Sequence, residues 1–268
     1  MKSQGQFSWT QGLLACCLLL AAPAWAQGDA NELMRRNFYA TKVSGFTGDI
    51  TMTLIDPRGE QRVRKMSIRS ALKDNGIDSA VMTRFVQPAD IKGTGFLQSE
   101  NSAADDDIWV YLPALGKTRR LASNNKRDSF FGTDFAYGDI LLPPVEKYQH
   151  TLLRTEKVDG VDCSVVESKP VDERTRSDSG YGRKLTWVDT SSFLERRVEY
   201  YDTRDVLLKT QVTSEVREVE PEKQRWLALQ RQMTNHQTGH RTVYRIDQYR
   251  VDSKVRDRGF SVRDLEEH

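Results

Sequence analysis

The sequence predicts a mainly β, single-domain protein in which about ten or eleven antiparallel strands curl into an open barrel. Three observations favour this fold class. Short segments rich in Val, Ile, Thr, Tyr and Trp follow one another, separated by turn-forming residues. The predicted strands carry polar side chains on both faces, as in residues 241–251, which is typical of an antiparallel sheet with a solvated face. No stretch of the chain has the composition of a linker between two domains.

The first 26 residues have the pattern of a secretory signal peptide. Lys2 precedes an apolar run, residues 13–22, and the small-x-small site Ala24-Trp25-Ala26 follows it. A helix needs roughly 20 apolar residues to span a bilayer, so this run is too short to serve as a stable anchor. We therefore expect cleavage after Ala26 and a mature chain, residues 27–268, that is secreted into a compartment that allows disulfides.

The predicted elements of the mature chain begin with one helix, at residues 30–40, and continue as strands. Ile50, Met52 and Leu54 alternate with threonines, and the chain then turns at residues 56–59, where Pro presets φ and Gly accepts a positive φ. Asp159-Gly160 marks a second hairpin. The remaining strands are expected at 61–69, 79–86, 107–112, 117–121, 152–158, 163–169, 184–189, 194–201, 206–219, 226–235 and 241–251.

The composition excludes several classes of protein. The 40 Lys and Arg residues are balanced by 38 Asp and Glu, so no net field favours nucleic acid, which is not an expected partner. No long apolar run follows residue 26, so the mature chain is not expected to span a membrane. Only Cys163 remains after cleavage, which excludes an internal disulfide and a Cys-rich metal framework.

Motifs of catalysis and cofactor binding are missing from the sequence. His236 and His240 have the spacing of a helical metal pair, but Gly239 lies between them and no Glu follows His236. There is no Gly-x-Ser-x-Gly elbow, no phosphate-binding Gly loop and no dinucleotide fingerprint. We therefore expect no catalytic residues, no metal and no cofactor, and the protein is not expected to be an enzyme.

The most informative segment is 119–140, where aromatic side chains gather in a stretch too rich in Gly and Asp to form a good strand. Aromatic residues in a loop must bury against the protein's own sheet or against a ligand. Two interpretations stay open: a loop that plugs the barrel mouth, or a lid that lines an apolar pocket. Trp109 and Tyr111 share one side of their strand and either line the same cavity or belong to the core. The candidate lining residues are Trp109, Tyr111, Phe130, Phe131, Phe135 and Tyr137.

Four basic side chains lie in the first part of this segment: Arg119, Arg120, Lys126 and Arg127. A local basic cluster can contact anionic headgroups or an acidic face of a partner protein. An ordinary solvated loop explains the same residues, so both interpretations stay open.

Three motifs of the chain resemble those of a known family. They are Phe130-Phe131-Gly132-Thr133-Asp134-Phe135-Ala136-Tyr137-Gly138-Asp139-Ile140, Trp109-Val110-Tyr111-Leu112-Pro113 with Arg119-Arg120, and Gly93-Thr94-Gly95-Phe96-Leu97. Over most of its mature length the chain resembles the outer-membrane lipoprotein-sorting proteins, relatives of the LolA and LolB lipoprotein carriers. The resemblance implies an open half-barrel with a few short helices as a lid, whose apolar concavity holds acyl chains of lipid or lipoprotein. It also implies transport across the periplasm toward the outer membrane and, as a candidate partner, an inner-membrane exporter of the resistance-nodulation-division (RND) type.

Two departures from the small carriers leave the cargo open. The mature chain is longer than LolA and LolB and does not begin with cysteine, so we expect a soluble carrier rather than a lipid-anchored receptor. In this interpretation the six aromatic residues bind lipid, and the four basic residues contact headgroups or a partner. The alternative function is a non-carrying accessory subunit of an exporter, with its hollow filled by side chains. An envelope hydrolase would need an acid, a base and a nucleophile that the sequence does not display.

Overall fold

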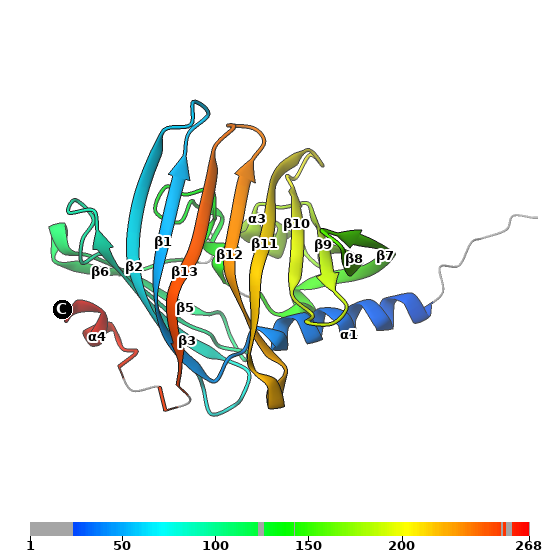
Figure 1. Ribbon diagram of the computed structural model, residues 1–268, viewed down its shortest axis with the longest axis horizontal. Helices are drawn as coiled ribbons and strands as arrows, with labels where there is room; N and C mark the ends of the chain where they lie inside the picture. The colour runs from blue at the N-terminus through cyan, green and yellow to red at the C-terminus, as the bar shows by residue number, and fades with distance from the viewer. Residues whose placement is uncertain (1–23, 123–125, 142, 253, 256–258, 268) are drawn as a thin grey trace, which may run out of the picture.

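A computed structural model of the protein describes residues 24–122, 126–141, 143–252, 254–255 and 259–267. Thirteen antiparallel strands form one sheet that curls around a hollow (Figure 1). The strands are β1 (Gly45–Ile55), β2 (Gln61–Leu72), β3 (Ser79–Gln87), β4 (Gly95–Ser99), β5 (Asp107–Leu112), β6 (Lys117–Arg120), β7 (Tyr148–Val158), β8 (Val161–Pro170), β9 (Arg183–Asp189), β10 (Glu195–Tyr201), β11 (Leu207–Glu220), β12 (Arg225–Asn235) and β13 (Arg241–Val251).

The order of the strands leaves the barrel open. Across the sheet they run β6-β5-β4-β3-β2-β1-β13-β12-β11-β10-β9-β8-β7, so β1 and β13 bring the two ends of the chain together at the middle. β6 and β7 form the two edges of the sheet. The predicted fold class, a mainly β open antiparallel barrel, is therefore confirmed.

The sheet has more strands than the expected ten or eleven: each of the twelve expected ranges corresponds to a strand, and β4 is the strand for which no range was expected. In this five-residue strand Phe96 faces the hollow, whereas Leu97 is buried on the outer face beside the C-terminal helix. A strand that is buried on both faces has no alternation of polar and apolar residues, so its sequence cannot be told from a loop.

Two tight turns follow from their sequences as predicted. Between β1 and β2 the carboxylate of Asp56 accepts hydrogen bonds from the backbone N–H groups of Arg58 and Glu60, and Gly59 has a φ of 89°. Between β7 and β8, Asp159 and Gly160 have φ values of 49° and 81°. Positive φ at both central residues gives the tight hairpin for which Asp-Gly is typical.

The longest helix, α1 (Ala24–Ala40), lies across one end of the hollow beside β7 and β12 (Figure 1). Two contacts fix its last turns: Asn37 donates to the carbonyl of Phe193 (2.8 Å), and Arg225 donates to the carbonyl of Tyr39. Just after the helix, Lys42 forms a buried ion pair with Glu100. The remaining helices are α2 (Tyr137–Ile140), α3 (Glu173–Ser179), α4 (Val262–Glu266) and the short 3-10 turns Pro113–Leu115, Val145–Lys147 and Pro221–Lys223.

Most of the predicted signal peptide lies outside the described residues. Helix α1 begins at Ala24, earlier than the expected 30–40, and passes through the predicted cleavage point after Ala26. Cleavage itself stays a prediction. Within the described ranges, no helix combines the length and apolar character needed to cross a membrane.

Candidate functional site: the plugged hollow of the sheet

The concave face of the sheet carries the main apolar core. Ile50 and Met52 of β1, with Ile108 and Val110 of β5, point into the hollow and are buried there. Residues 128–141, which we call the plug, pack onto this concave surface, and their buried aromatic side chains belong to the same apolar cluster. The site is therefore an apolar concave surface that is covered by a loop of the same chain.

The plug is buried through its aromatic side chains. Phe130, Phe135 and Tyr137 are only 3%, 4% and 7% exposed. Phe130 packs edge-on against Phe96 of β4, with ring centroids 5.4 Å apart, and Phe96 also stacks with Tyr137 at 5.8 Å. Such pairs add about 0.5–1.5 kcal/mol each beyond the area they bury.

Phe131 and Phe135 extend the aromatic contacts toward neighbouring strands. Phe131 meets Phe85 of β3 at 4.9 Å, and Phe135 meets Tyr244 of β13 at 6.5 Å. The four plug aromatics predicted to share one site are therefore brought together in the hollow. Of the two interpretations of this loop, the packed plug describes the observed conformation.

A tight turn at the tip of the plug presents these rings. Phe131 and Gly132 both have positive φ values, 49° and 76°. The hydroxyl of Thr133 donates to the carbonyl of Phe130 (2.8 Å), and that of Ser129 donates to the carbonyl of Thr133 (2.5 Å). A left-handed Phe costs about 1–2 kcal/mol, which the local hydrogen bonds and the burial of its neighbours offset.

A buried ion pair ties the plug to β11. Asp139 Oδ2 lies 2.6 Å from Lys209 Nζ, and the two side chains are 1% and 6% exposed. The same carboxylate accepts hydrogen bonds from the backbone N–H of Ala136 (2.6 Å) and the hydroxyl of Tyr181 (2.7 Å). Burial, and then the charge of Asp139, raises the pKa of Tyr181 well above its usual value, so this hydroxyl stays a donor.

Further tethers reach the other side of the hollow. Asp134 exchanges two hydrogen bonds with Thr242 of β13: its carboxylate accepts from the hydroxyl (2.7 Å), and the hydroxyl accepts from its backbone N–H (3.1 Å). The guanidinium of Arg64, in β2, donates to the carbonyl of Phe131. Within the described residues the plug is thus joined to the sheet by side chains, while its one β-bridge, Ser129 to Ala136, is internal.

The prediction that Trp109 and Tyr111 line the cavity is wrong. In β5 it is Ile108 and Val110 that face the hollow, so Trp109 and Tyr111 point to the outer face, where their cross-strand neighbours are Leu97 and Gly95. Every residue from Ile108 to Leu112 is apolar or aromatic, so the sequence does not reveal which face of the strand is buried.

The four basic residues do not form one cluster. Arg119 and Arg120 are successive residues of β6 and therefore point to opposite faces; Arg120 forms an ion pair with Asp107. Lys126 lies 3.9 Å from Asp106, and Arg127 lies beside Gly180. Their expected role in headgroup or partner contact stays a prediction.

Sequence reasoning missed the polar half of the site: Lys209, Tyr181, Thr242 and Arg64. The strand pattern did not reveal that Lys209 faces inward, because the buried positions Lys209, Gln211 and Thr213 of Leu207–Glu220 are all polar. A lysine on a buried face requires an acidic partner. The two aspartates of the plug motif, Asp134 and Asp139, were the available candidates.

Three small pockets lie around residues 143–147, which follow the plug; two of them are lined by α1 and two by plug residues. Their volumes are about 100, 220 and 80 Å³, and polar side chains contribute much of their lining. His150 anchors this region, with Nδ1 2.8 Å from Ser168 Oγ and Nε2 3.0 Å from the carbonyl of Val145. Each pocket is smaller than the roughly 300–1,000 Å³ of typical small-molecule sites.

The described ranges hold no group of three His, Cys, Asp or Glu side chains placed to bind a metal ion. His150 is buried, and this burial lowers its pKa, so the imidazole is neutral at pH 7. Its two partners, Ser168 and the Val145 carbonyl, make it a structural tie between β7, β8 and the residues that follow the plug.

Known proteins match most of the chain. The family model that matches, over residues 78–267, is described as "-like: Uncharacterized protein". A crystal structure described as a candidate outer membrane lipoprotein-sorting protein domain from Vibrio parahaemolyticus is 30% identical, with a TM-score of 0.81; the match covers 90% of this chain and 99% of that chain. A DUF1329 family protein from Desulfovibrio piger is 28% identical, with a TM-score of 0.80 and the same coverage. Among curated proteins, none matches the sequence.

A more distant structure supports the fold. A LolA superfamily protein from Nitrosomonas europaea is 20% identical, with a TM-score of 0.65, and the match covers 87% of this chain and 97% of that chain. This likeness supports the fold over most of the chain. By its similarity to the Vibrio domain across nearly its full described length, the chain belongs to the family of outer-membrane lipoprotein-sorting proteins.

Proposed function

We propose that the protein is a periplasmic carrier that binds acyl chains of lipid or lipoprotein on the concave face of its sheet, in the place that the plug occupies. The observation that carries this proposal is the way the hollow is filled. Its apolar wall is covered by a loop that is attached through side chains rather than through strand pairing. A cover of that kind can be exchanged for a cargo while the sheet stays intact.

The energies of the two occupants are comparable. Each plug aromatic contributes roughly 1.5–3 kcal/mol by leaving water, and breaking the tethers adds to the cost of displacement. An acyl chain contributes about 0.8 kcal/mol for each buried methylene, so one long chain matches the plug aromatics and two exceed them. A lipid with several chains is therefore expected to displace the plug, whereas a single short chain is not.

A second candidate, a non-carrying accessory subunit of an exporter, is favoured by one observation. The pockets beside the plug are small, and the hollow itself is packed with aromatic side chains. In this function the plug is a permanent part of the core. An RND-type transporter is the candidate partner, and it would be bound without any need for lipid.

Lipid analysis of the native protein tests the proposal. The full chain, with its own leader, is produced in a Gram-negative host, purified from the periplasm without detergent and denatured, and the released lipid is identified by mass spectrometry. A carrier releases lipid in near-stoichiometric amounts, and an unrelated periplasmic protein purified in parallel releases none. Lipid-free protein that also fails to bind phospholipid vesicles would support the accessory function instead.

The location has its own test. N-terminal sequencing of the purified protein is expected to begin at Gln27, the residue after the predicted cleavage site. A chain that retains residues 1–26 would contradict the proposed release into the periplasm.

A further inference from the structure

The middle of the sheet contains a seam where β12 and β13 separate. These two strands pair from Gln230↔Arg245 to Thr234↔Arg241 only. Beyond that point residues 225–229 of β12 still pair with β11, and residues 246–251 of β13 still pair with β1. The sheet is therefore split along part of its length, between two strands that each keep their other neighbour.

Local irregularities lie beside the seam. In β13 the register against β1 shifts from Asp49↔Gln248 to Ile50↔Ile246, which leaves Asp247 as an extra, bulged residue. In β11, Glu215 has a positive φ of 51° next to the start of the seam. Bulges of this kind bend a strand and increase its twist, which turns β13 away from β12.

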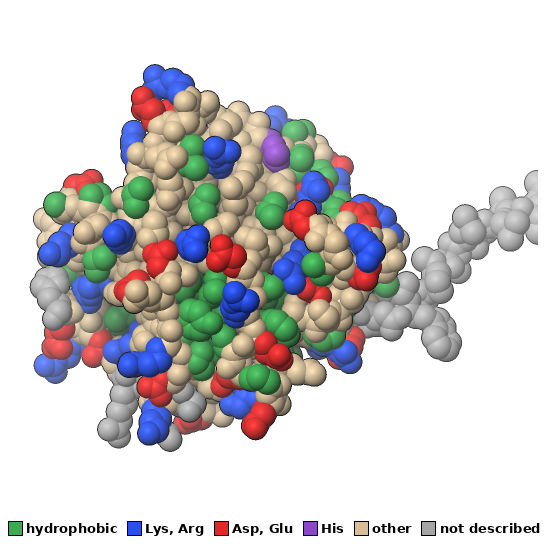
Figure 2. All heavy atoms as spheres, viewed as in Figure 1, with side chains coloured by type: hydrophobic (Ala, Val, Ile, Leu, Met, Phe, Trp, Pro, Cys, Tyr) green, Lys and Arg blue, Asp and Glu red, His purple; other side chains and the backbone are tan. Residues whose placement is uncertain are grey.

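The floor of the seam is apolar and continuous with the core. Val43, Phe46 and Leu227 form a buried cluster there. Ile68 and Leu229 pack both against this cluster and against the main cluster that contains the plug. Figure 2 shows a hydrophobic patch on the viewed face in the region where Figure 1 draws β12 and β13 apart. An apolar path therefore runs from the outer surface to the plugged hollow.

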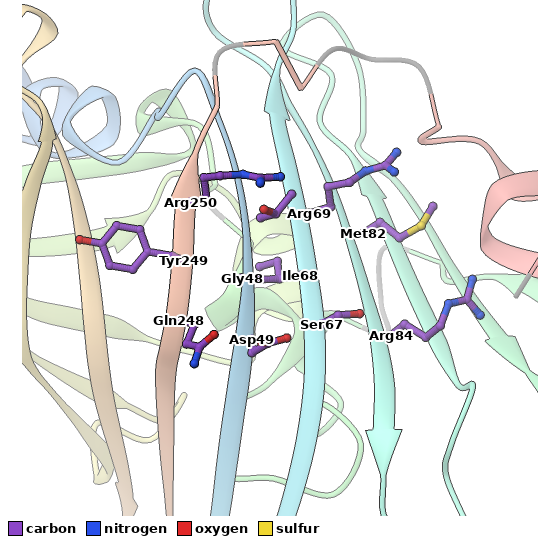
Figure 3. Close-up of a pocket in the computed structure, with 11 residues that line it drawn as sticks. Gly48, Asp49, Ser67, Ile68, Arg69, Met82, Arg84, Gln248, Tyr249 and Arg250 are labelled. Carbon is purple, nitrogen blue, oxygen red and sulfur yellow. The ribbon is translucent and has the colours of Figure 1, made fainter.

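Tyr249 stands at the edge of this path. It is 38% exposed, opposite Gly48 of β1, where a Cβ atom would come within 2.5 Å of the Gln248 carbonyl. Figure 3 shows Tyr249 on one side of β13, and Arg250 on the other, toward Arg69 and Arg84. Successive residues of β13 thus present an aromatic ring to the seam and a cation to the outer face.

The cationic side is a groove of about 550 Å³ on the outer face, over β1, β2, β3 and β13 (Figure 3). Arg69, Arg84 and Arg250 line it together with the hydroxyls of Thr47 and Ser67, and Asp49 is the one acid among the lining residues.

Two of these arginines hold the C-terminal segment: Arg69 donates to the carbonyl of Gly259 (2.5 Å), and Arg84 donates to that of Leu265 (2.8 Å). Arg250 has no hydrogen-bond or ion-pair partner among the residues that the structure describes. Three cations against one carboxylate leave the groove positive, with Arg250 available to a ligand.

We infer that the seam is a lateral entry through which an acyl chain of an anionic phospholipid reaches the hollow, while its phosphate headgroup rests in the arginine groove beside Arg250. An apolar slot next to a cationic groove fits a ligand with a hydrocarbon tail and a negative head. This inference rests on the proposed carrier function and adds to it the route and the charge of the cargo.

Site-specific photocrosslinking tests the route. A photoreactive benzoylphenylalanine replaces Tyr249 in one variant and Val212 in another, and each is mixed with vesicles of dioleoylphosphatidylglycerol. Val212 is a matched control, because it is 37% exposed and lies on β11, away from the seam. Acyl-chain adducts, counted by mass spectrometry, are expected several-fold more often at position 249 than at position 212.

A charge variant tests the headgroup. Arg250→Gln removes one cation near an anionic surface, which is worth about 1 kcal/mol or roughly fivefold in affinity for phosphatidylglycerol vesicles. Binding to phosphatidylcholine vesicles is expected to stay unchanged. Equal affinity of the variant and the native protein for phosphatidylglycerol would overturn the headgroup assignment.

The outcomes separate this inference from the carrier function. If the native protein binds lipid but the two photoreactive variants form adducts equally often, the lateral entry is overturned and the carrier function stands. Native protein that binds neither kind of vesicle overturns both. Preferential adducts at position 249 support the entry whatever the headgroup variant does.

Discussion

At the scale of single residues, the site depends on a charge pair that the hollow has desolvated. Asp139→Asn leaves the ammonium group of Lys209 buried without a carboxylate. Removing one partner of such a pair costs about 3–5 kcal/mol. Urea denaturation of the variant is expected to show this loss in the free energy of unfolding.

Two comparisons sharpen this prediction. Asp139→Leu with Lys209→Met removes both charges and is expected to recover part of the lost stability. Lys157→Met breaks an ion pair with Asp162 in which both side chains are more than half exposed, and it is expected to cost less than about 1 kcal/mol. An Asp139→Asn effect as small as that of the surface pair would show that the plug is not held by this contact.

The carboxyl group of Asp189 leads to a prediction about how the stability of the protein depends on pH. Its burial opposes ionisation, but hydrogen bonds from Ser191 and then from Arg196 outweigh it and lower the pKa of its carboxyl from 3.8 to about 2. A carboxyl group whose pKa is lower in the folded state than in the unfolded state stabilises the protein at pH values above the unfolded-state pKa. This stabilisation is lost as the pH falls through the folded-state pKa.

The native protein should therefore lose stability between about pH 4 and pH 2 relative to the Asp189→Asn variant. Urea unfolding of both proteins across this range checks the prediction. A constant difference between the two free energies of unfolding would contradict it.

At the scale of elements, the plug is a loop whose side chains form part of the hydrophobic core. Phe130→Ala is expected to cost about 3–5 kcal/mol, because it removes a buried ring that touches Phe96, Phe131 and Tyr137. Val63→Ala, at an exposed position of β2, serves as the control and should change stability by less than about 0.5 kcal/mol. Chemical denaturation of both variants checks the pair, and similar values would mean that the plug is not packed as described.

The sequence predicts this element well and its neighbours less well. Aromatic residues within a Gly- and Asp-rich stretch cannot form a strand, and the burial of Phe130, Phe135 and Tyr137 follows from that. The side of β5 on which Trp109 and Tyr111 lie could not be predicted, because both faces of this strand are apolar. Lys209 as the partner of Asp139 lies 70 residues away in sequence, and only the register of the sheet brings the two together.

At the scale of the whole molecule, turn chemistry made the open antiparallel sheet predictable. Pro, Gly and Asp-Gly signals separate the strands, and alternation then gives their direction. The seam between β12 and β13 was not predictable, because a bulge at Asp247 changes strand pairing without changing the alternation of the flanking residues in any recognisable way. The filling of the hollow by residues 128–141 likewise depends on tertiary packing, and sequence reasoning had left it open between a plug and a lid.

The measurement that tests the account most directly is amide hydrogen exchange of residues 128–141, with and without phosphatidylglycerol vesicles whose binding is confirmed by native mass spectrometry. If acyl chains take the place of the plug, its amides exchange faster in the lipid-bound protein, while those of β2 and β11 keep their protection. Lipid-bound protein in which the plug amides stay equally protected, or become more so, would contradict the exchange of plug for cargo.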